Sequence, residues 1–337
     1  MELLQFPRAG EKIFHEVLEN GLNVFVFPKP EFQKSYAFFA TRYGGMDTRF
    51  CLNGQWQDTP AGIAHYLEHK MFDTQEGNAL QDLAANGASP NAFTSNAITG
   101  YYFECTEKFE ENLKILLSFV SAPWFTPESV AKEQGIIGQE IGMIEDDPNW
   151  QVYQNLTKAM YHTHPIRTSV AGTVESISHI TDKTLYDCHK AFYDPANMVL
   201  CAAGDLDLET VCAAAREILP KTPGPIADRD YGGQEPEQVS RNQIEISMEV
   251  STPIFQLGFK GDAPAQGEAG LRQSLLGELA CEALLGTSSP LYARLYREGL
   301  INKSFYYDYE TEPGCSFLCV GGESRDPEAV RAAVLEE

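Results

Sequence analysis

The chain of 337 residues carries a formal net charge of −23, and 43% of its residues are hydrophobic. This length is sufficient for two domains of ordinary size, and the composition is that of a globular protein. The negative charge argues against nucleic acid and anionic membrane surfaces as partners, because both would repel it, whereas basic or neutral polypeptides remain compatible.

Two features indicate a reducing environment. The N-terminal residues lack the basic and apolar regions of a signal peptide, and no run approaches the length of a membrane span, so the cytoplasm is the expected location. The eight cysteines have no C-x-x-C spacing and are expected to be reduced and mostly buried, neither paired in disulfides nor bound to zinc. They are Cys51, Cys105, Cys188, Cys201, Cys212, Cys281, Cys315 and Cys319.

The N-terminal part of the chain predicts three strands followed by a helix. An Asn-Gly pair between two apolar runs indicates a hairpin between the first two strands. The expected strands cover residues 12–18, 22–28 and 35–43, and a loop over about 46–59 leads into a helix over 62–72. Thr59 is the expected N-cap of this helix, and Pro60 is expected in its first turn.

This helix contains the sequence His65-Tyr66-Leu67-Glu68-His69. His65 and His69 are one turn apart, so their imidazoles project from one face, with Glu68 beside them. Two imidazoles at this spacing are suited to hold Zn²⁺, and a nearby carboxylate can take a proton from a metal-held water. The order H-x-x-E-H is the inverzincin signature. A chance match or a pair of ordinary surface histidines is the alternative until a third ligand is found.

The next elements predict a mixed α+β unit. They are a helix over 78–86, strands over 91–95 and 98–105, a helix over 107–120, and a long helix from 127 to about 147 that ends at Pro148.

The long helix offers a third zinc ligand, since a catalytic zinc takes three protein ligands and leaves one position for water. Glu140 has the pairs Ile136-Ile137 behind it and Met143-Ile144 ahead of it. Its carboxylate is therefore expected to emerge from an apolar face, where a cation would compensate its burial. Glu133 lies two turns earlier on this face and would support the site or replace Glu140 as a ligand. An ordinary salt bridge or surface pair is the alternative for both glutamates.

Several stretches resemble the pitrilysin and insulinase family of zinc metallopeptidases, in particular its bacterial branch related to mitochondrial processing peptidase. The strongest are Gly-Ile-Ala-His-Tyr-Leu-Glu-His at 62–69, Gly-Ala-Ser-Pro-Asn-Ala-Phe-Thr at 87–94, and the segment 133–140. Further matches lie at 179–181, 192–198 and 204–206, so the resemblance spans essentially the whole chain.

The resemblance implies one Zn²⁺ per chain, bound by His65, His69 and Glu140. It implies that Glu68 is the general base and that Glu133 supports the site from behind the ligands. The spacing from His69 to Glu140 is a little shorter than in many relatives. A purely structural zinc would need a fourth protein ligand, such as Glu133.

The family also uses an edge strand near the zinc to pair with an extended substrate. By resemblance this strand contains Asn91, Ala92, Phe93 and Thr94, although an ordinary sheet strand is an equal expectation from the sequence alone. His162 and His164 lie on one side of an extended segment and suggest a second metal site, but ordinary loop histidines are the favoured interpretation.

The second half repeats the opening of the first. A helix over 208–219 closes the first domain, and a Pro- and Gly-rich stretch follows it. Strands over 243–250 and 254–259 and a helix over 267–285 then begin a new unit, followed by strand-like segments over 304–309 and 316–321 and a helix near 327. Residues 277–284 contain no histidine, so only the first half is expected to bind zinc.

We therefore expect a zinc-binding catalytic domain over 1–222, a linker over 223–242 and a partial homologous domain over 243–337. Roughly a hundred residues of this second domain are expected to be missing by the usual domain size. The family takes an Arg and a Tyr from the second half to hold the substrate carbonyl. Arg294, Arg297, Tyr306 and Tyr307 lie in the matching region, but their spacing departs from the family pattern, and the two arginines are equally expected to be solvated.

The sequence as a whole predicts an α+β fold of two homologous halves, each a mainly antiparallel sheet packed by helices, with the second truncated. The expected function is a zinc-dependent endopeptidase that hydrolyses extended peptides or unfolded segments with metal-activated water and Glu68 as base. A homodimer, or a heterodimer with an inactive homologue, is the expected assembly if the chain does not work alone. The alternative is a non-catalytic peptide-binding or scaffold subunit that partners an active homologue.

Overall fold

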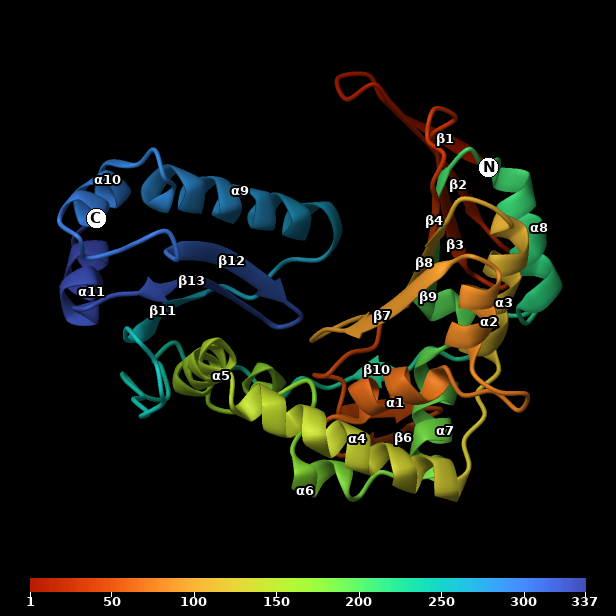
Figure 1. Cartoon of the computed structure of the whole chain (residues 1–337), viewed down its shortest axis with the longest axis horizontal. Helices are drawn as coiled ribbons and strands as arrows, with labels where there is room; N and C mark the ends of the chain where they lie inside the picture. The colour runs from red at the N-terminus through yellow and green to blue at the C-terminus, as the bar shows by residue number, and fades with distance from the viewer. The chain divides into compact units, whose positions relative to one another are not determined.

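The computed structural model describes residues 1–337 and divides by its internal contacts into two compact units. The first comprises residues 1–139 and 169–230, and the second comprises residues 140–168 and 231–337. Each contains mainly antiparallel strands and packed helices, which confirms the expected α+β class (Figure 1). No helix of the chain is both long and apolar enough to cross a membrane.

A seven-stranded sheet is the framework of the first unit. Its strand order is β1-β2-β3-β9-β4-β8-β7, and every neighbouring pair is antiparallel except β3 with β9. The strands are β1 (Glu2–Phe6), β2 (Glu11–Val17), β3 (Asn23–Pro28), β4 (Ser35–Thr41), β7 (Ser89–Thr94), β8 (Thr99–Cys105) and β9 (Met198–Gly204).

The register of this sheet aligns core side chains in rows. Val24, Leu200, Phe39 and Tyr101 are paired in succession across β3, β9, β4 and β8, and all four are fully buried. The next partner in the row is Ala92 on β7, which is an edge strand of the sheet. The core of the unit therefore continues directly to the strand that was expected to bind substrate.

Helices pack around this sheet, and most begin at a polar cap. Asn78, Thr181 and Asp207 each accept a hydrogen bond from a backbone N–H in the first turn of the helix that follows. The helices are α1 (Ile63–Met71), α2 (Ala79–Ala85), α3 (Phe109–Ser121), α4 (Pro127–Glu145), α6 (Val174–Ile177), α7 (Asp182–Phe192), α8 (Leu208–Ile218) and a short 3₁₀ turn over Pro195–Asn197. The boundary between the two units falls inside α4.

The loop expected over 46–59 is wrong, because it contains a small hairpin. Strands β5 (Arg49–Leu52) and β6 (Gln55–Asp58) pair across Asn53 and Gly54, which both have positive φ. This is the Asn-Gly turn signal of a tight hairpin, which short strands made easy to miss. A third strand, β10 (Asp228–Arg229), pairs with β5, and Arg229 forms an ion pair of 3.2 Å with the buried Asp47.

The second unit has a three-stranded sheet of order β11-β13-β12. Its elements are α5 (Pro148–Met160), a 3₁₀ turn over Pro165–Arg167, β11 (Ile254–Gly261), α9 (Gly267–Leu285), α10 (Pro290–Arg297), β12 (Tyr306–Glu312), β13 (Cys315–Glu323) and α11 (Pro327–Glu336). From β11 onwards, the order strand, two helices, two strands and helix repeats that of β4, α1, α2, β7, β8 and α3, apart from the β5–β6 hairpin between β4 and α1. The sheet order β4-β8-β7 is repeated as well. This repetition of order matches the expected pair of related halves.

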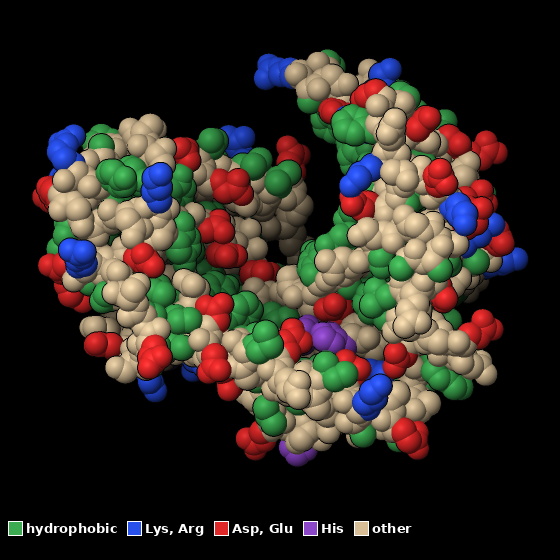
Figure 2. Space-filling model, in the orientation of Figure 1, with side chains coloured by type: hydrophobic (Ala, Val, Ile, Leu, Met, Phe, Trp, Pro, Cys, Tyr) green, Lys and Arg blue, Asp and Glu red, His purple; other side chains and the backbone are tan.

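One prediction for the second unit is wrong and another is confirmed. The strand expected over 243–250 is absent, because no strand of the chain pairs with this segment and an alternating pattern alone does not form a ladder. The helix expected over 267–285 is confirmed as α9, which places Cys281 and Leu285 in the core and leaves Leu271 and Leu279 exposed. Acidic side chains are scattered over the face shown in Figure 2 and do not form one patch.

A largely buried glutamate ties together two separate segments of the second unit. The Glu235 carboxylate accepts hydrogen bonds from the backbone N–H groups of His162, Thr163 and His164 at 2.9, 2.6 and 2.6 Å. It also lies 3.5 Å from the Lys260 ammonium. Burial alone would raise the pKa of Glu235, but the three N–H donors outweigh this effect and lower the pKa to about 2.

We predict that Glu235→Gln lowers the free energy of unfolding by about 1–3 kcal/mol, because backbone donors lose a charged acceptor. The folded-state pKa of about 2 is below the ordinary value of 4.5, so the carboxylate contributes full stability above pH 4.5 and loses it as the pH falls towards 2. Denaturant unfolding at several pH values measures this difference. Glu237→Gln, at an exposed position two residues away, is the matched control and should change stability little. An equal effect of both variants at pH 7 would contradict the assignment.

Candidate metal centre

Helix α1 is held inside the first unit from its first residue. Its N-cap is Gly62, not Thr59 as expected, and it has a φ of 90°. A Cβ at this glycine would lie 2.5 Å from the Ala171 carbonyl oxygen, so both the backbone conformation and the close approach require glycine. The Thr-Pro pair upstream gave a familiar helix-start signal, but the chain contact at Ala171 decides where the helix begins.

Three side chains that can bind a metal converge here. One potential ligand atom from each of His65, His69 and Glu140 lies within 4.8 Å of the others. His65 and His69 project from α1 with their ring centroids 4.6 Å apart, and Glu140 projects from α4. The structure therefore brings together the three residues that the sequence predicted as ligands.

Glu133 lies behind this cluster and contacts one of its histidines. Its Oε1 is 3.2 Å from His69 Nδ1, and both side chains are largely buried. The hydrogen bond from His69 is the main reason that the pKa of Glu133 is lowered. A carboxylate that accepts from Nδ1–H leaves Nε2 as the metal-binding atom and fixes the ring orientation.

The donor set fits a catalytic zinc. Zinc accepts imidazole nitrogens and carboxylate oxygens at about 2.0–2.2 Å, and catalytic sites have three such protein ligands. Two histidines and a glutamate supply this set, and the partner of His69 is of the usual carboxylate type. Softer metals that prefer thiolates find no cysteine in this cluster.

The apolar face expected around Glu140 is only partly correct. Ile137 and Ile141 are buried, but Ile136 is 48% and Met143 is 74% exposed. At about 100° per residue these last two turn away from the packed side of α4. Glu140 therefore stands at the border of the buried face and not in its middle.

Glu68 is connected to the edge strand of the sheet. Its Oε2 accepts a hydrogen bond of 2.8 Å from the Thr94 hydroxyl, and its side chain is 9% exposed. Within β7, Ala92 and Thr94 share the core side of the sheet, whereas Asn91 and Phe93 are exposed. The predicted base and the predicted substrate strand thus meet at one hydrogen bond.

The two histidines that suggested a second metal site have structural partners. His164 is 3% exposed, with Nε2 bonded to the Pro313 carbonyl at 3.0 Å and Nδ1 accepting from the Ile166 N–H at 3.2 Å. His162 Nε2 lies 3.2 Å from the Gln238 carbonyl. These contacts agree with loop histidines, which was the favoured interpretation.

The four arginine and tyrosine candidates of the second half are either exposed or in contact with neighbouring polar side chains. Arg294 lies 3.5 Å from Glu336, and Arg297 is exposed near the end of α10. The Tyr307 hydroxyl donates to Glu282, which raises the Tyr307 pKa to about 12, and Tyr306 accepts from the Gln256 side chain.

Sequence reasoning missed two residues of α1 that contact α4. The Tyr66 hydroxyl donates to the Val130 carbonyl, and the Lys70 ammonium lies 3.4 Å from the Ser129 carbonyl. Tyr66 and Lys70 are spaced as His65 and His69 are and so share a face of α1, but the sequence does not state which helix packs against that face.

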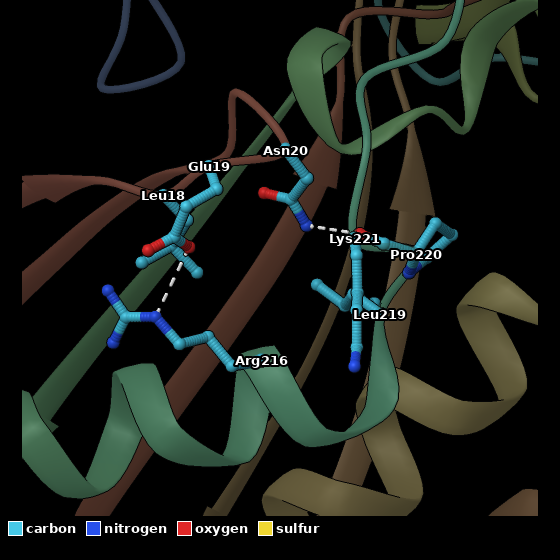
Figure 3. A pocket seen from close by; sticks show the side chains of 7 residues that line it. All are labelled: Leu18, Glu19, Asn20, Arg216, Leu219, Pro220 and Lys221. Atoms are coloured by element: carbon cyan, nitrogen blue, oxygen red, sulfur yellow. Dashed lines mark hydrogen bonds and ion pairs between the residues drawn. The ribbon is translucent and has the colours of Figure 1, made fainter.

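A surface pocket elsewhere in the first unit does not resemble a second centre. Figure 3 shows its lining by the β2–β3 turn and the end of α8, at Leu18, Glu19, Asn20, Arg216, Leu219, Pro220 and Lys221. Asn20 donates to the Pro220 carbonyl at 2.8 Å, and Arg216 lies 3.3 Å from Glu19. Its central polar groups are thus already engaged in closing the fold.

Two family models match the chain and together cover most of it. The model described as Insulinase (Peptidase family M16) matches residues 53–174, and that described as Peptidase M16 inactive domain matches residues 179–337. The chain is 42% identical to the uncharacterised zinc protease YmfH of Bacillus subtilis (strain 168), over 96% of this chain and 77% of that protein.

Solved structures show the same fold. The crystal structure of an M16-like peptidase from Alicyclobacillus acidocaldarius has a TM-score of 0.94 and 36% identity, over 99% of this chain and 78% of that chain. Pitrilysin has a TM-score of 0.74 at 17% identity, over 99% of this chain and 37% of that chain, and so shares the fold.

We predict that Glu133→Ala weakens zinc binding about 10- to 100-fold, because His69 loses the acceptor that orients its ring. Competition with a chromophoric chelator measures the dissociation constant without any enzyme assay. Glu145→Ala, on the exposed side of the same helix, is the control and should leave the affinity unchanged. Equal affinities of the Glu133 variant and the unsubstituted protein would exclude this role.

Proposed function

The chain belongs to the insulinase family of peptidases (family M16), and on this premise we propose that it is a zinc-dependent endopeptidase acting on extended peptides or unfolded protein segments. The observation that carries the proposal is the convergence of His65, His69 and Glu140 within 4.8 Å. The zinc protease name of its relative from Bacillus subtilis supports the same metal and reaction class.

In this proposal His65, His69 and Glu140 hold the zinc. When bound there, zinc would supply Lewis acidity, lowering the pKa of water and polarising a peptide carbonyl. Glu133 keeps the His69 Nδ1 proton engaged, so that Nε2 would be the atom that binds the ion.

Glu68 is the general base. The Thr94 hydroxyl occupies Oε2 at 2.8 Å and orients the carboxylate, and Oε1 then takes a proton from the attacking water. Glu68 holds this proton and passes it to the nitrogen of the leaving fragment. Its low exposure of 9% limits exchange of the proton with bulk water.

The substrate strand is β7, through Asn91, Ala92, Phe93 and Thr94. As an edge strand it offers one free side for strand addition, which recognises backbone and tolerates many sequences. The Ala92 N–H is bonded to the Asn91 side-chain oxygen at 2.9 Å, a contact that an incoming strand would replace. A substrate laid along β7 would pass Thr94 and hence the Glu68 carboxylate.

The partner of the protein in this proposal is its polypeptide substrate, and its high negative charge disfavours nucleic acid. The rival proposal is a subunit that binds peptides without cleaving them, alone or beside an active homologue. It is favoured by one observation, the match of residues 179–337 to a domain described as inactive. The intact His-x-x-Glu-His sequence of the first half favours the peptidase.

We predict that Glu68→Gln retains zinc and lowers cleavage of an unstructured peptide by about 10²–10⁴-fold, the usual contribution of a general base. Glu76→Gln, an exposed glutamate in the turn after α1, is the matched control and should keep full activity. Metal analysis and peptide mass spectrometry on the same samples measure both quantities. Unchanged turnover in the Glu68 variant would exclude it as the base.

We predict one zinc per chain and loss of cleavage when a chelator removes it, with recovery on readdition of zinc. A library of unstructured peptides, with products identified by mass spectrometry, tests this without knowledge of the natural substrate. Peptide binding without cleavage in the zinc-loaded protein would favour the rival proposal. A protein without zinc binding would exclude the peptidase.

A further inference from the structure

Lys70 is a buried charge with no role in the proposed chemistry. Its side chain is only 1% exposed, although it directly follows His69 near the end of α1. Lysine is rarely buried to this extent, because an ammonium loses its hydration and needs polar partners in return. A residue that carries this cost beside a metal ligand calls for an explanation.

Lys70 has one polar partner in the turn after α1 and another in α4. Its ammonium pairs with Asp73 in the turn that follows α1, and it lies 3.4 Å from the Ser129 carbonyl in the first turn of α4. One turn earlier on α1, the Tyr66 hydroxyl donates to the neighbouring carbonyl of Val130. A carbonyl oxygen has two lone pairs, so the Ser129 and Val130 carbonyls can accept these bonds in addition to the hydrogen bonds within α4.

The contacts between α1 and α4 form a short ladder. The Lys70 ammonium lies near the Ser129 carbonyl and the Tyr66 hydroxyl donates to the next carbonyl, that of Val130. One turn further along α4, Glu133 contacts His69. These bonds fix both the spacing and the rotation of α1 against the N-terminal half of α4. The orientation of the His69 ring towards the metal depends on this arrangement, because Glu133 can reach Nδ1 only if the two helices keep it.

We propose that Tyr66 and Lys70 are positioning residues of the metal centre, which clamp α1 to the first turn of α4 so that the His69–Glu133 pair is formed before metal binds. An apolar side chain at position 70 would pack against α4 in several ways, whereas a buried ammonium is stable only in geometries that satisfy it. The positive charge of Lys70 also favours the ionised form of Glu133 and is one of the influences that lower its pKa.

This inference rests on the proposed zinc site but not on peptide cleavage, so it is tested by metal binding. In Lys70→Met, a volume-matched variant without the ammonium, zinc affinity should fall about 10- to 100-fold, as for other residues that support metal ligands. Tyr66→Phe removes a single hydroxyl and keeps the packing, and it should weaken binding about fivefold, the equivalent of one net hydrogen bond.

Lys132→Met is the matched control. Lys132 also exerts a charge on Glu133, but it is exposed and makes no bond to α1, so its loss separates the charge from the clamp. The Lys132 variant should bind zinc as the unsubstituted protein does.

Two readouts distinguish positioning from simple stabilisation. The visible spectrum of the Co²⁺-substituted protein reports ligand geometry and should change in Lys70→Met. The rise in melting temperature on adding zinc should shrink, because it depends on metal affinity. A variant that melts earlier without metal, yet keeps the spectrum, the affinity and the zinc-induced rise, would overturn the inference. If Lys70→Met does not fold, the same three measurements on Tyr66→Phe decide the question. If the unsubstituted protein binds neither zinc nor Co²⁺, the proposed function is overturned instead.

Discussion

The structure depends on keeping polar side chains of one buried helix in contact with partners that replace water. Helix α1 carries His65, Glu68 and Lys70 into the interior of the first unit, where unpaired polar groups are costly, and leaves His69 only partly buried. Glu133 contacts His69, the Ser129 carbonyl of α4 lies near the Lys70 ammonium, and Thr94 donates to Glu68. The same contacts that make burial tolerable also set the directions in which the functional groups point. Stability and chemistry therefore draw on one set of hydrogen bonds.

The sequence predicts best those residues of the site whose relative positions are set within a single helix. Helical spacing alone places His65, Glu68 and His69 together, and the structure agrees. The sequence pattern pointed to Glu140 because an apolar face was expected around it. Ile136 was counted in that face but is exposed, so the pattern was only partly correct. The resemblance to the family selected Glu140 independently. Contacts between helices, such as those of Tyr66 with α4, depend on the tertiary fold and have no periodic signal of their own.

The same distinction explains the errors in the fold. The segment 243–250 alternates as a strand does, yet a strand needs a neighbour and none is supplied. The start of α1 moved from Thr59 to Gly62 because of a contact with Ala171, far along the chain.

The position of β9 affects how the protein is made. This strand lies between β3 and β4 in the sheet, although it follows both in the sequence by more than half of the first unit's length. During synthesis β3 and β4 leave the ribosome long before their common neighbour exists, so the core row through Val24 and Phe39 stays open until Leu200 arrives. Pairing over such distances in sequence slows folding. Helix α1 is thus translated early, whereas α7, which packs against it, is completed only shortly before β9.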